Sequence, residues 1–135
     1  MCANRSSHLE ILGLAGIPLI QSGDDLAGLI IGALEGQALH LQDGDVIVVT
    51  SKVVSKAEDR WVNLDEVVTS DRAREVAQRC GKDPREVEVI LSEATAISRV
   101  RSGVIVTEHR LGFVSANSGI DHSNTRPDGN WWLLL

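Results

Sequence analysis

The sequence predicts an α+β fold, in which a mixed sheet is flanked by helices. Two observations carry this prediction: apolar residues recur at helical spacing in three segments, and short β-branched runs bounded by turn residues alternate with them. A length of 135 residues fits one domain with a buried core. We therefore expect residues 1–8 to be a disordered tail and residues 9–135 to form a single α+β domain.

The first third is predicted to contain a strand, a helix and a second strand. The first strand covers residues 9–15 and ends where glycine and proline follow. The helix covers residues 24–36, because its apolar residues fall on one face. After the turn signal Asp43–Gly44, residues 45–56 are predicted as a strand. Its β-branched run, residues 46–50, is typical of a strand buried on both faces.

Two further helices are predicted in the middle of the chain, over residues 70–80 and 84–95. Ser70 can cap the first of them, and Gly81 can end it in a left-handed conformation. Asp83 is a good N-cap for the second helix and is followed by proline at the first helical position.

The last third returns to strand patterns. Residues 103–116 predict a hairpin, and residues 131–135 predict a final strand made of two tryptophans and three leucines. Five consecutive apolar residues at a surface need cover. We therefore expect them to be buried against a second copy of the chain or against a missing C-terminal half of the protein.

Composition excludes several classes of function. The hydrophobic fraction of 43% and the charged fraction of 24% exclude a disordered or collagen-like chain. A net charge of −6 with only 3% aromatic residues argues against binding of nucleic acid or of a membrane surface. No apolar run approaches the roughly 18–20 residues that span a bilayer. We expect a soluble, cytoplasmic protein.

Two polar segments are candidates for chemistry, since the common phosphate-loop, dinucleotide and zinc motifs are absent. The first, Thr50–Lys56, brings two lysines and three hydroxyl side chains to the end of a predicted strand. Lysine suits phosphate, and hydroxyls can donate to phosphate oxygens or complete the shell of a metal. The alternative is a solvated edge strand whose lysines face outward.

The second segment is Ser115–Asn124, which follows the predicted hairpin. Asp121 and Asn124 carry side-chain oxygens that suit Mg²⁺ or Mn²⁺, and Gly119 allows close approach of the backbone to a ligand. The alternative is a turn whose asparagine and aspartate side chains bond to the local backbone.

Both segments lie in longer stretches that resemble the signatures of the coenzyme F-420 gamma-glutamyl ligases. The first stretch is Leu41–Glu58, and the second is Thr107–Val114 followed by Ala116–Asn124. Ile17–Pro18 and Gly23–Leu26 are similar to the opening of this family. Order and spacing agree along nearly the whole chain. The resemblance implies a gamma-glutamyl-ligase-like fold of which only the N-terminal part is present.

The resemblance also implies a GTP-dependent ligase. Such enzymes activate a carboxylate of the deazaflavin precursor of coenzyme F-420 as an acyl phosphate, and the amine of L-glutamate then displaces phosphate to form an amide. The aspartate with which the family binds Mg²⁺ or Mn²⁺ maps to Asp121, and no catalytic residue is transferred. The family's GTP contacts map to Ile17, Pro18, Leu19, Ile20, Ser51, Lys56 and Asn124.

The chain departs from the family in two places. Family members often have an acidic residue after the proline of the opening loop, where this chain has Leu19. The family also continues with a second metal-binding aspartate and a threonine, and Asp128 is not in that context. The leading expectation is the GTP-binding half of a ligase, as a homodimer or with a missing C-terminal half. The alternatives are an inactive nucleotide-binding or interaction subunit, such as a truncated paralogue, and a structural remnant without a ligand.

Overall fold

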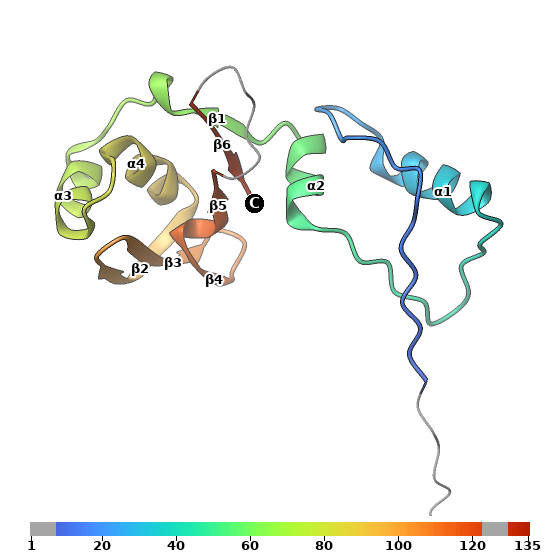
Figure 1. The fold of residues 1–135 in the computed structure, drawn as a ribbon. Coiled ribbons are helices and arrows are strands. Elements are labelled where there is room, and N and C mark those ends of the chain that lie inside the picture. Colours follow the sequence, from blue (N-terminus) through green and yellow to red (C-terminus); the bar gives the residue numbers. More distant parts are fainter. Residues whose placement is uncertain (1–7, 123–129) are drawn as a thin grey trace, which may run out of the picture.

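The computed structural model describes residues 8–122 and 130–135, and it confirms the α+β class (Figure 1). The strands divide between two antiparallel sheets of three strands each, in the orders β1-β6-β5 and β2-β3-β4. The elements in chain order are α1 (Leu26–Gly36), α2 (Ser51–Ala57), β1 (Trp61–Asn63), η1 (Leu64–Glu66), α3 (Asp71–Cys80), α4 (Pro84–Ser92), β2 (Ala94–Arg101), β3 (Val104–His109), β4 (Val114–Ala116), η2 (Asn117–Gly119), β5 (Ile120–Asp121) and β6 (Trp131–Leu134).

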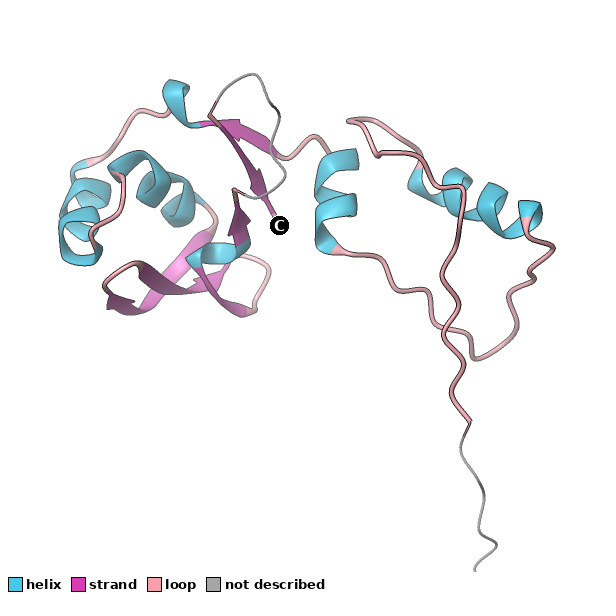
Figure 2. Cartoon of the chain, in the orientation of Figure 1, coloured by secondary structure: helices cyan, strands magenta, loops and turns pink. Residues whose placement is uncertain are grey.

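The main core lies between the helix pair α3–α4 and the sheet β2-β3-β4 (Figure 2). Val87, Ile90 and Ile105 are completely buried there. The predicted hairpin is confirmed: β3 pairs with β4, and Thr107 lies opposite Ser115. Burying one valine or isoleucine side chain contributes roughly 1.5–3 kcal/mol to stability. The second half of the chain therefore has a core of its own.

Both ends of α3 and the start of α4 were predicted correctly. Ser70 Oγ accepts a hydrogen bond from Ala73 N at 3.1 Å, and Gly81 ends α3 with φ of 70°. Asp83 Oδ1 accepts from Arg85 N at 2.8 Å at the start of α4. These caps satisfy backbone groups that a helix leaves without partners at its termini.

The predicted end of the second helix is wrong, because α4 stops at Ser92 and residues 94–101 form β2 instead. No strand is predicted there from the sequence pattern. Ile97 and Val100 reach the core from β2 rather than from a helix. This segment pairs with β3 from Ala94 to Arg101, so its backbone groups find their partners in the neighbouring strand.

The predicted final strand is confirmed as β6, and it has neighbours on both sides within the chain. β6 is the central strand of its sheet, paired with β1 through Trp61 and Leu133 and with β5 through Ile120 and Leu134. Leu133 is only 1% exposed. The short strands β1 and β5 cover this apolar run within the chain, and neither of them was predicted.

Both predicted strands of the first third are wrong. Residues 9–15 and 45–50 are extended but belong to no sheet in the described part of the chain, and residues 51–57 form the helix α2. Val46 and Val48 are 82% and 87% exposed, so the predicted burial on both faces is wrong as well. A strand needs a neighbour for its backbone groups, whereas a helix satisfies its own.

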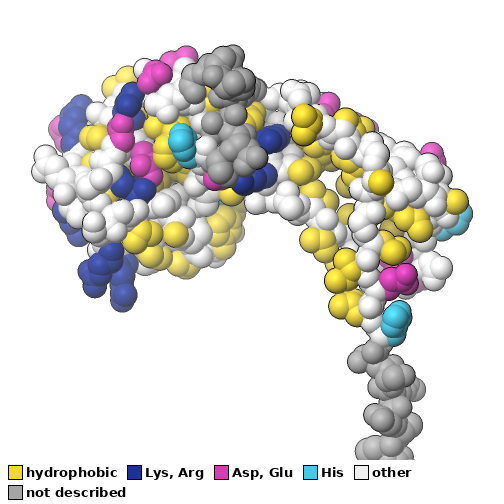
Figure 3. Space-filling view, in the orientation of Figure 1, with side chains coloured by type: hydrophobic (Ala, Val, Ile, Leu, Met, Phe, Trp, Pro, Cys, Tyr) yellow, Lys and Arg dark blue, Asp and Glu magenta, His cyan; other side chains and the backbone are white. Residues whose placement is uncertain are grey.

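The helix α1 is confirmed with a slightly later start, at Leu26, and Asp25 Oδ1 caps it by accepting from Gly28 N. In Figure 3, apolar side chains gather along the part of the molecule that carries α1 and the two extended segments. In the portion that the structure describes, no helix has both the length and the apolar character that a bilayer crossing requires.

Candidate functional site

The helix α2 carries the two lysines of the first polar segment on one face. Lys52 and Lys56 are four residues apart, which places their side chains one helical turn apart on the same side. Ser51 is exposed in the first turn of the helix. The edge-strand alternative is therefore wrong, since alternating lysines would need an extended backbone.

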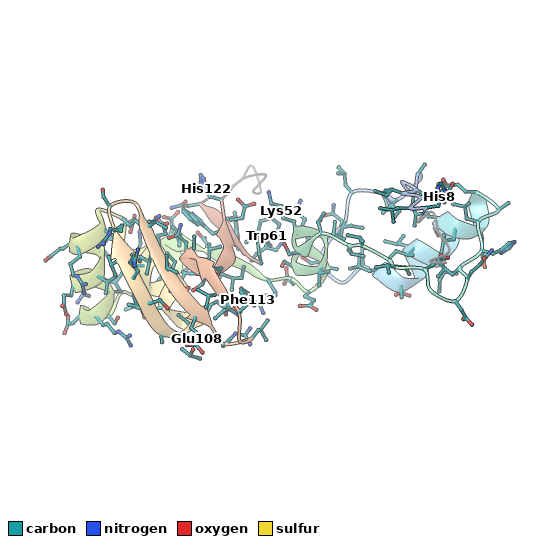
Figure 4. All side chains as sticks on the ribbon, turned by 90° about the horizontal axis from the view of Figure 1, so that it is seen from below. His8, Lys52, Trp61, Glu108, Phe113 and His122 are labelled. Carbon is teal, nitrogen blue, oxygen red and sulfur yellow. The ribbon has the colours of Figure 1, made fainter. Side chains whose placement is uncertain are left out.

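The structure brings the two polar segments together through an ion pair. Lys52 Nζ lies 2.5 Å from Asp121 Oδ2, and the side chains are 37% and 21% exposed. Figure 4 shows Lys52 pointing from α2 toward the sheet that contains Trp61. Thr50–Lys56 and the loop that ends at Asp121 thus form one partly exposed, polar site.

The turn η2 positions Asp121. Asn117, Ser118 and Gly119 all have positive φ, at 52°, 52° and 71°. Such backbone is costly for residues other than glycine, so it persists only where side chains hold it. Asn117 Oδ1 accepts from Ile105 N at 3.0 Å, and Ser118 Oγ donates to Ile90 O at 2.8 Å.

These hydrogen bonds reach β3 and α4. The described residues therefore do not form the alternative, a turn whose side chains bond only to the local backbone. The buried hydroxyl of Thr107 also forms a hydrogen bond with Ser118 Oγ at 2.8 Å. The backbone before Asp121 is therefore fixed to both α4 and β3, which gives its carboxylate a defined place.

The opening loop leads to the other end of α2. Gly23 N donates to Ala57 O at 2.8 Å, and Ser22 Oγ donates to Asp59 Oδ1 at 2.5 Å. Ile17, Pro18 and Leu19 precede this contact and are exposed, whereas Ile20 is half-buried. The opening loop is therefore joined to α2 through Gly23 and Ser22, a few residues after the predicted contacts. Asn124 lies outside the described residues.

Asp121 fits a divalent cation only if ligands from outside the protein complete the coordination shell. Within residues 8–122 and 130–135 no group of three or more His, Cys, Asp or Glu side chains could hold a metal. A dedicated protein cage is therefore not found there. A hard carboxylate oxygen that already holds a positive group does suit Mg²⁺ or Mn²⁺ when phosphates and water supply the other ligands.

A buried carboxylate that the sequence analysis missed fixes the position of α2. Glu93 Oε2 receives hydrogen bonds from Arg60 Nη2 at 2.6 Å, Arg110 Nε at 3.1 Å and His109 Nε2 at 3.1 Å. Leu111 N donates to His109 Nδ1 at 3.1 Å, so the ring hydrogen is on Nε2 and points at the carboxylate.

Burial alone raises the pKa of Glu93, but the hydrogen bonds and charges of Arg60 and Arg110 outweigh it and hold the pKa below its ordinary value. Arg60 N also donates to Ser55 O at 2.9 Å, and Arg60 O accepts from Leu134 N at 3.0 Å. Glu93 therefore ties the end of α2 to α4 and β6. Its partners are far apart in sequence, so no local pattern signals the cluster.

An apolar groove in the first third of the chain is separate from this site. Its volume is about 530 Å³, and it lies between α1 and the extended segments 10–17 and 39–50. Its lining is mostly apolar and includes Ile17 and Thr50, but not Lys52, Lys56 or Asp121. We interpret this groove as apolar surface without a packing partner rather than as a phosphate site.

Comparison with known proteins agrees with the two motifs. A family model described as F420-0:Gamma-glutamyl ligase matches residues 15–135. The chain is 48% identical over 116 residues to the coenzyme F420:L-glutamate ligase of Methanothermobacter thermautotrophicus, covering 86% of this chain and 46% of the relative. The corresponding ligase of Methanopyrus kandleri is 47% identical over 122 residues, which are 88% of this chain and 46% of the relative.

A third relative is the coenzyme F420:L-glutamate ligase of Halorubrum lacusprofundi, 39% identical over 132 residues, with 93% of this chain and 50% of the relative covered. The chain thus spans about half the length of the curated relatives it matches. A match over this much of the chain, through both polar segments, identifies the family. The chain belongs to the F420-0:gamma-glutamyl ligase family.

Proposed function

We propose that this chain supplies the GTP-phosphate and metal-binding part of a ligase that joins L-glutamate to the deazaflavin precursor of coenzyme F-420. The single observation that carries the proposal is the contact between Lys52 and Asp121, which unites the two segments that resemble the family. It places a carboxylate and two lysines of α2 in one partly exposed site.

In the proposed reaction, a carboxylate oxygen of the precursor attacks the terminal phosphorus of GTP, and GDP leaves. The amine of L-glutamate then attacks the acyl carbon, phosphate leaves, and the amine proton passes to solvent. Lys56 stabilises the negative charge of the transferring phosphoryl group, and the hydroxyl of Ser51 donates to a phosphate oxygen. A bound Mg²⁺ or Mn²⁺ supplies further neutralisation of phosphate charge.

The remaining predicted residues bind the nucleotide and take no part in the bond-forming steps. Ile17, Pro18, Leu19 and Ile20 present apolar side chains and backbone groups before the contact between Gly23 and α2. Asn124 follows Asp121 by three residues and completes the proposed set. The proposed active assembly is a homodimer or includes the further half that the relatives have.

Isothermal titration of GTP into the 135-residue chain tests the proposal, with and without Mn²⁺. We expect GTP to bind, and to bind more tightly with Mn²⁺ in a manner that Asp121→Asn weakens. A folded chain that binds no GTP at about 1 mM, a concentration that detects even weak sites, contradicts the proposal.

Release of GDP in the presence of the precursor and L-glutamate is the second measurement. GTP binding without GDP release favours a nucleotide-binding subunit that lacks activity by itself. GTP-dependent formation of the glutamyl amide supports a competent ligase.

A further inference from the structure

The ammonium of Lys52 lies where a cation held by Asp121 would lie. Its Nζ is 2.5 Å from Asp121 Oδ2, on a carboxylate whose backbone is fixed by the turn η2. We propose that Lys52 takes the place of the divalent cation at Asp121 in the nucleotide-free protein and gives way to it when nucleotide phosphates bind. This inference rests on the proposed function and concerns the same site.

The ion pair is weak enough to exchange. Both side chains are partly exposed, at 37% and 21%, and pairs of this kind contribute little to stability. Lysine carries its charge on a flexible stem of four carbons, so the ammonium can leave without movement of α2. A divalent cation on the same oxygen repels the ammonium at short range, so the two positive groups compete for Asp121.

Nucleotide phosphates remove this competition in two ways. They offer Lys52 another negative partner, and they offer the metal the oxygen ligands that a single carboxylate lacks. Each ligand then increases the affinity for the other, and by linkage the two factors are equal. A preformed cage of carboxylates, in contrast, would bind metal without nucleotide.

Lys56 provides a matched control for the test. It lies on the same helix, one turn from Lys52, and its side chain makes no hydrogen bond or ion pair with any residue that the structure describes. Lys56→Gln and Lys52→Gln remove the same charge from the same face of α2. Only Lys52→Gln removes the ammonium that lies against the carboxylate of Asp121.

The experiment is a titration of Mn²⁺ into the nucleotide-free chain, with free Mn²⁺ measured by electron paramagnetic resonance. We expect Lys52→Gln to bind Mn²⁺ roughly fivefold or more tightly than Lys56→Gln, a common size for coupling between two ligands. Lys52→Arg keeps the positive charge and should bind no more tightly than the wild type. The double variant Lys52→Gln with Asp121→Asn should lose the gain.

Equal Mn²⁺ affinities of folded Lys52→Gln and Lys56→Gln overturn the inference, as does a gain that survives Asp121→Asn. The thermal midpoint of each variant shows whether it is folded. The Lys52→Arg variant keeps the test valid if loss of the ion pair unfolds the site, because stronger Mn²⁺ binding by this variant also contradicts the inference.

The outcome is separable from that of the proposed function. If GTP does not bind but Lys52→Gln still gains Mn²⁺ affinity through Asp121, the cation exchange is supported and the nucleotide site is wrong. If GTP binds but the two lysine variants do not differ, only the exchange is wrong. When both hold, saturating GTP should narrow the difference in Mn²⁺ affinity between the wild type and Lys52→Gln.

Discussion

Lys56 is the side chain whose removal tests nucleotide binding most directly. Its side chain makes no hydrogen bond or ion pair within the described residues, so its removal should leave folding nearly unchanged. We expect Lys56→Ala to weaken GTP binding by about 1.5–3 kcal/mol, the usual contribution of a hydrogen bond to a charged group. Calorimetric titration measures this, with Arg99→Ala, an exposed cation on β2, as the control. Unchanged affinity in folded Lys56→Ala would remove this residue from the site.

Glu93 controls stability rather than binding chemistry. Glu93→Gln leaves Arg60, whose side chain is 22% exposed, without its counter-charge. We expect a loss of about 1.5–3 kcal/mol at neutral pH, less than for a fully buried pair because Arg60 and Arg110 retain some solvent. Urea denaturation measures the loss. Glu108→Gln, an exposed glutamate on β3, is the control and should cost little.

The contribution of Glu93 also depends on pH, with a definite sign. The pKa of Glu93 is lower in the folded chain than its ordinary value, so the unfolded chain binds the proton first as pH falls. Its stabilising effect is complete above the ordinary glutamate pKa of about 4.3 and is lost as pH falls through the folded pKa. The stability difference between wild type and Glu93→Gln should therefore shrink below about pH 4. A difference that grows with acid would contradict this assignment.

At the scale of elements, deletion of β6 tests whether the sheet β1-β6-β5 can unfold independently of the sheet β2-β3-β4. Deleting residues 131–135 removes the central strand between β1 and β5, and with it the partners of Trp61 and Ile120. The core between α3, α4 and β3 contains none of the deleted residues. We expect the sheet β1-β6-β5 to unfold while the other sheet stays folded.

Tryptophan fluorescence can measure this result, since the chain has three tryptophans and the deletion leaves only Trp61. Its emission should shift to the red as it becomes exposed to water. Backbone amide spectra should still show folded signals for α3, α4 and β2 to β4. Emission from a protected Trp61 would mean that β1 does not depend on β6.

The elements that the sequence predicted correctly are those with local signals. Ser70, Gly81, Asp83 and the stripe of α3 all lie within residues 70–83, so the helices α3 and α4 could be located from short patterns. β1 and β5, in contrast, have only three and two residues and exist because β6 pairs with both. A pattern in the sequence cannot show a partner that lies far along the chain.

The absence of local signals for distant partners also explains how far the site could be predicted. Ser51 and Lys56 were identified from their residue types, but a β-branched run followed by polar residues predicted an extended backbone where the structure has α2. The contact of Lys52 with Asp121 and the cluster around Glu93 depend on tertiary structure. Sequence alone therefore identified the segments of the site but not the contacts that assemble them.

At the scale of the whole molecule, the exposed apolar residues of the first third favour association. The apolar side chains at residues 9–12 and 46–49 are all more than a third exposed. Apolar surface gathered in this way is typical of an interface. We expect the chain to self-associate through the extended segments rather than through β6, where the sequence analysis placed the contact.

A pair of substitutions tests this expectation. Val46→Thr with Val48→Thr keeps β-branched side chains but adds hydroxyls, and it should weaken association about fivefold or more. Val68→Thr is the control, since Val68 is 87% exposed but lies in a separate loop before α3. Sedimentation velocity over a range of concentrations measures the change. A wild type that stays monomeric at every concentration would contradict the expectation.

The place of β6 at the centre of its sheet also has a consequence for the order of folding during synthesis. The pairing of Trp61 with Leu133 closes a loop of about seventy residues, whereas β2 and β3 are joined by a turn at Gly103. On the ribosome, the β2–β3 hairpin can fold together with α3 and α4 before β6 is available to pair with β1. The ion pair that joins α2 to β5 then belongs to the last stage of folding. The proposed phosphate site is thus assembled only after β6 has left the exit tunnel.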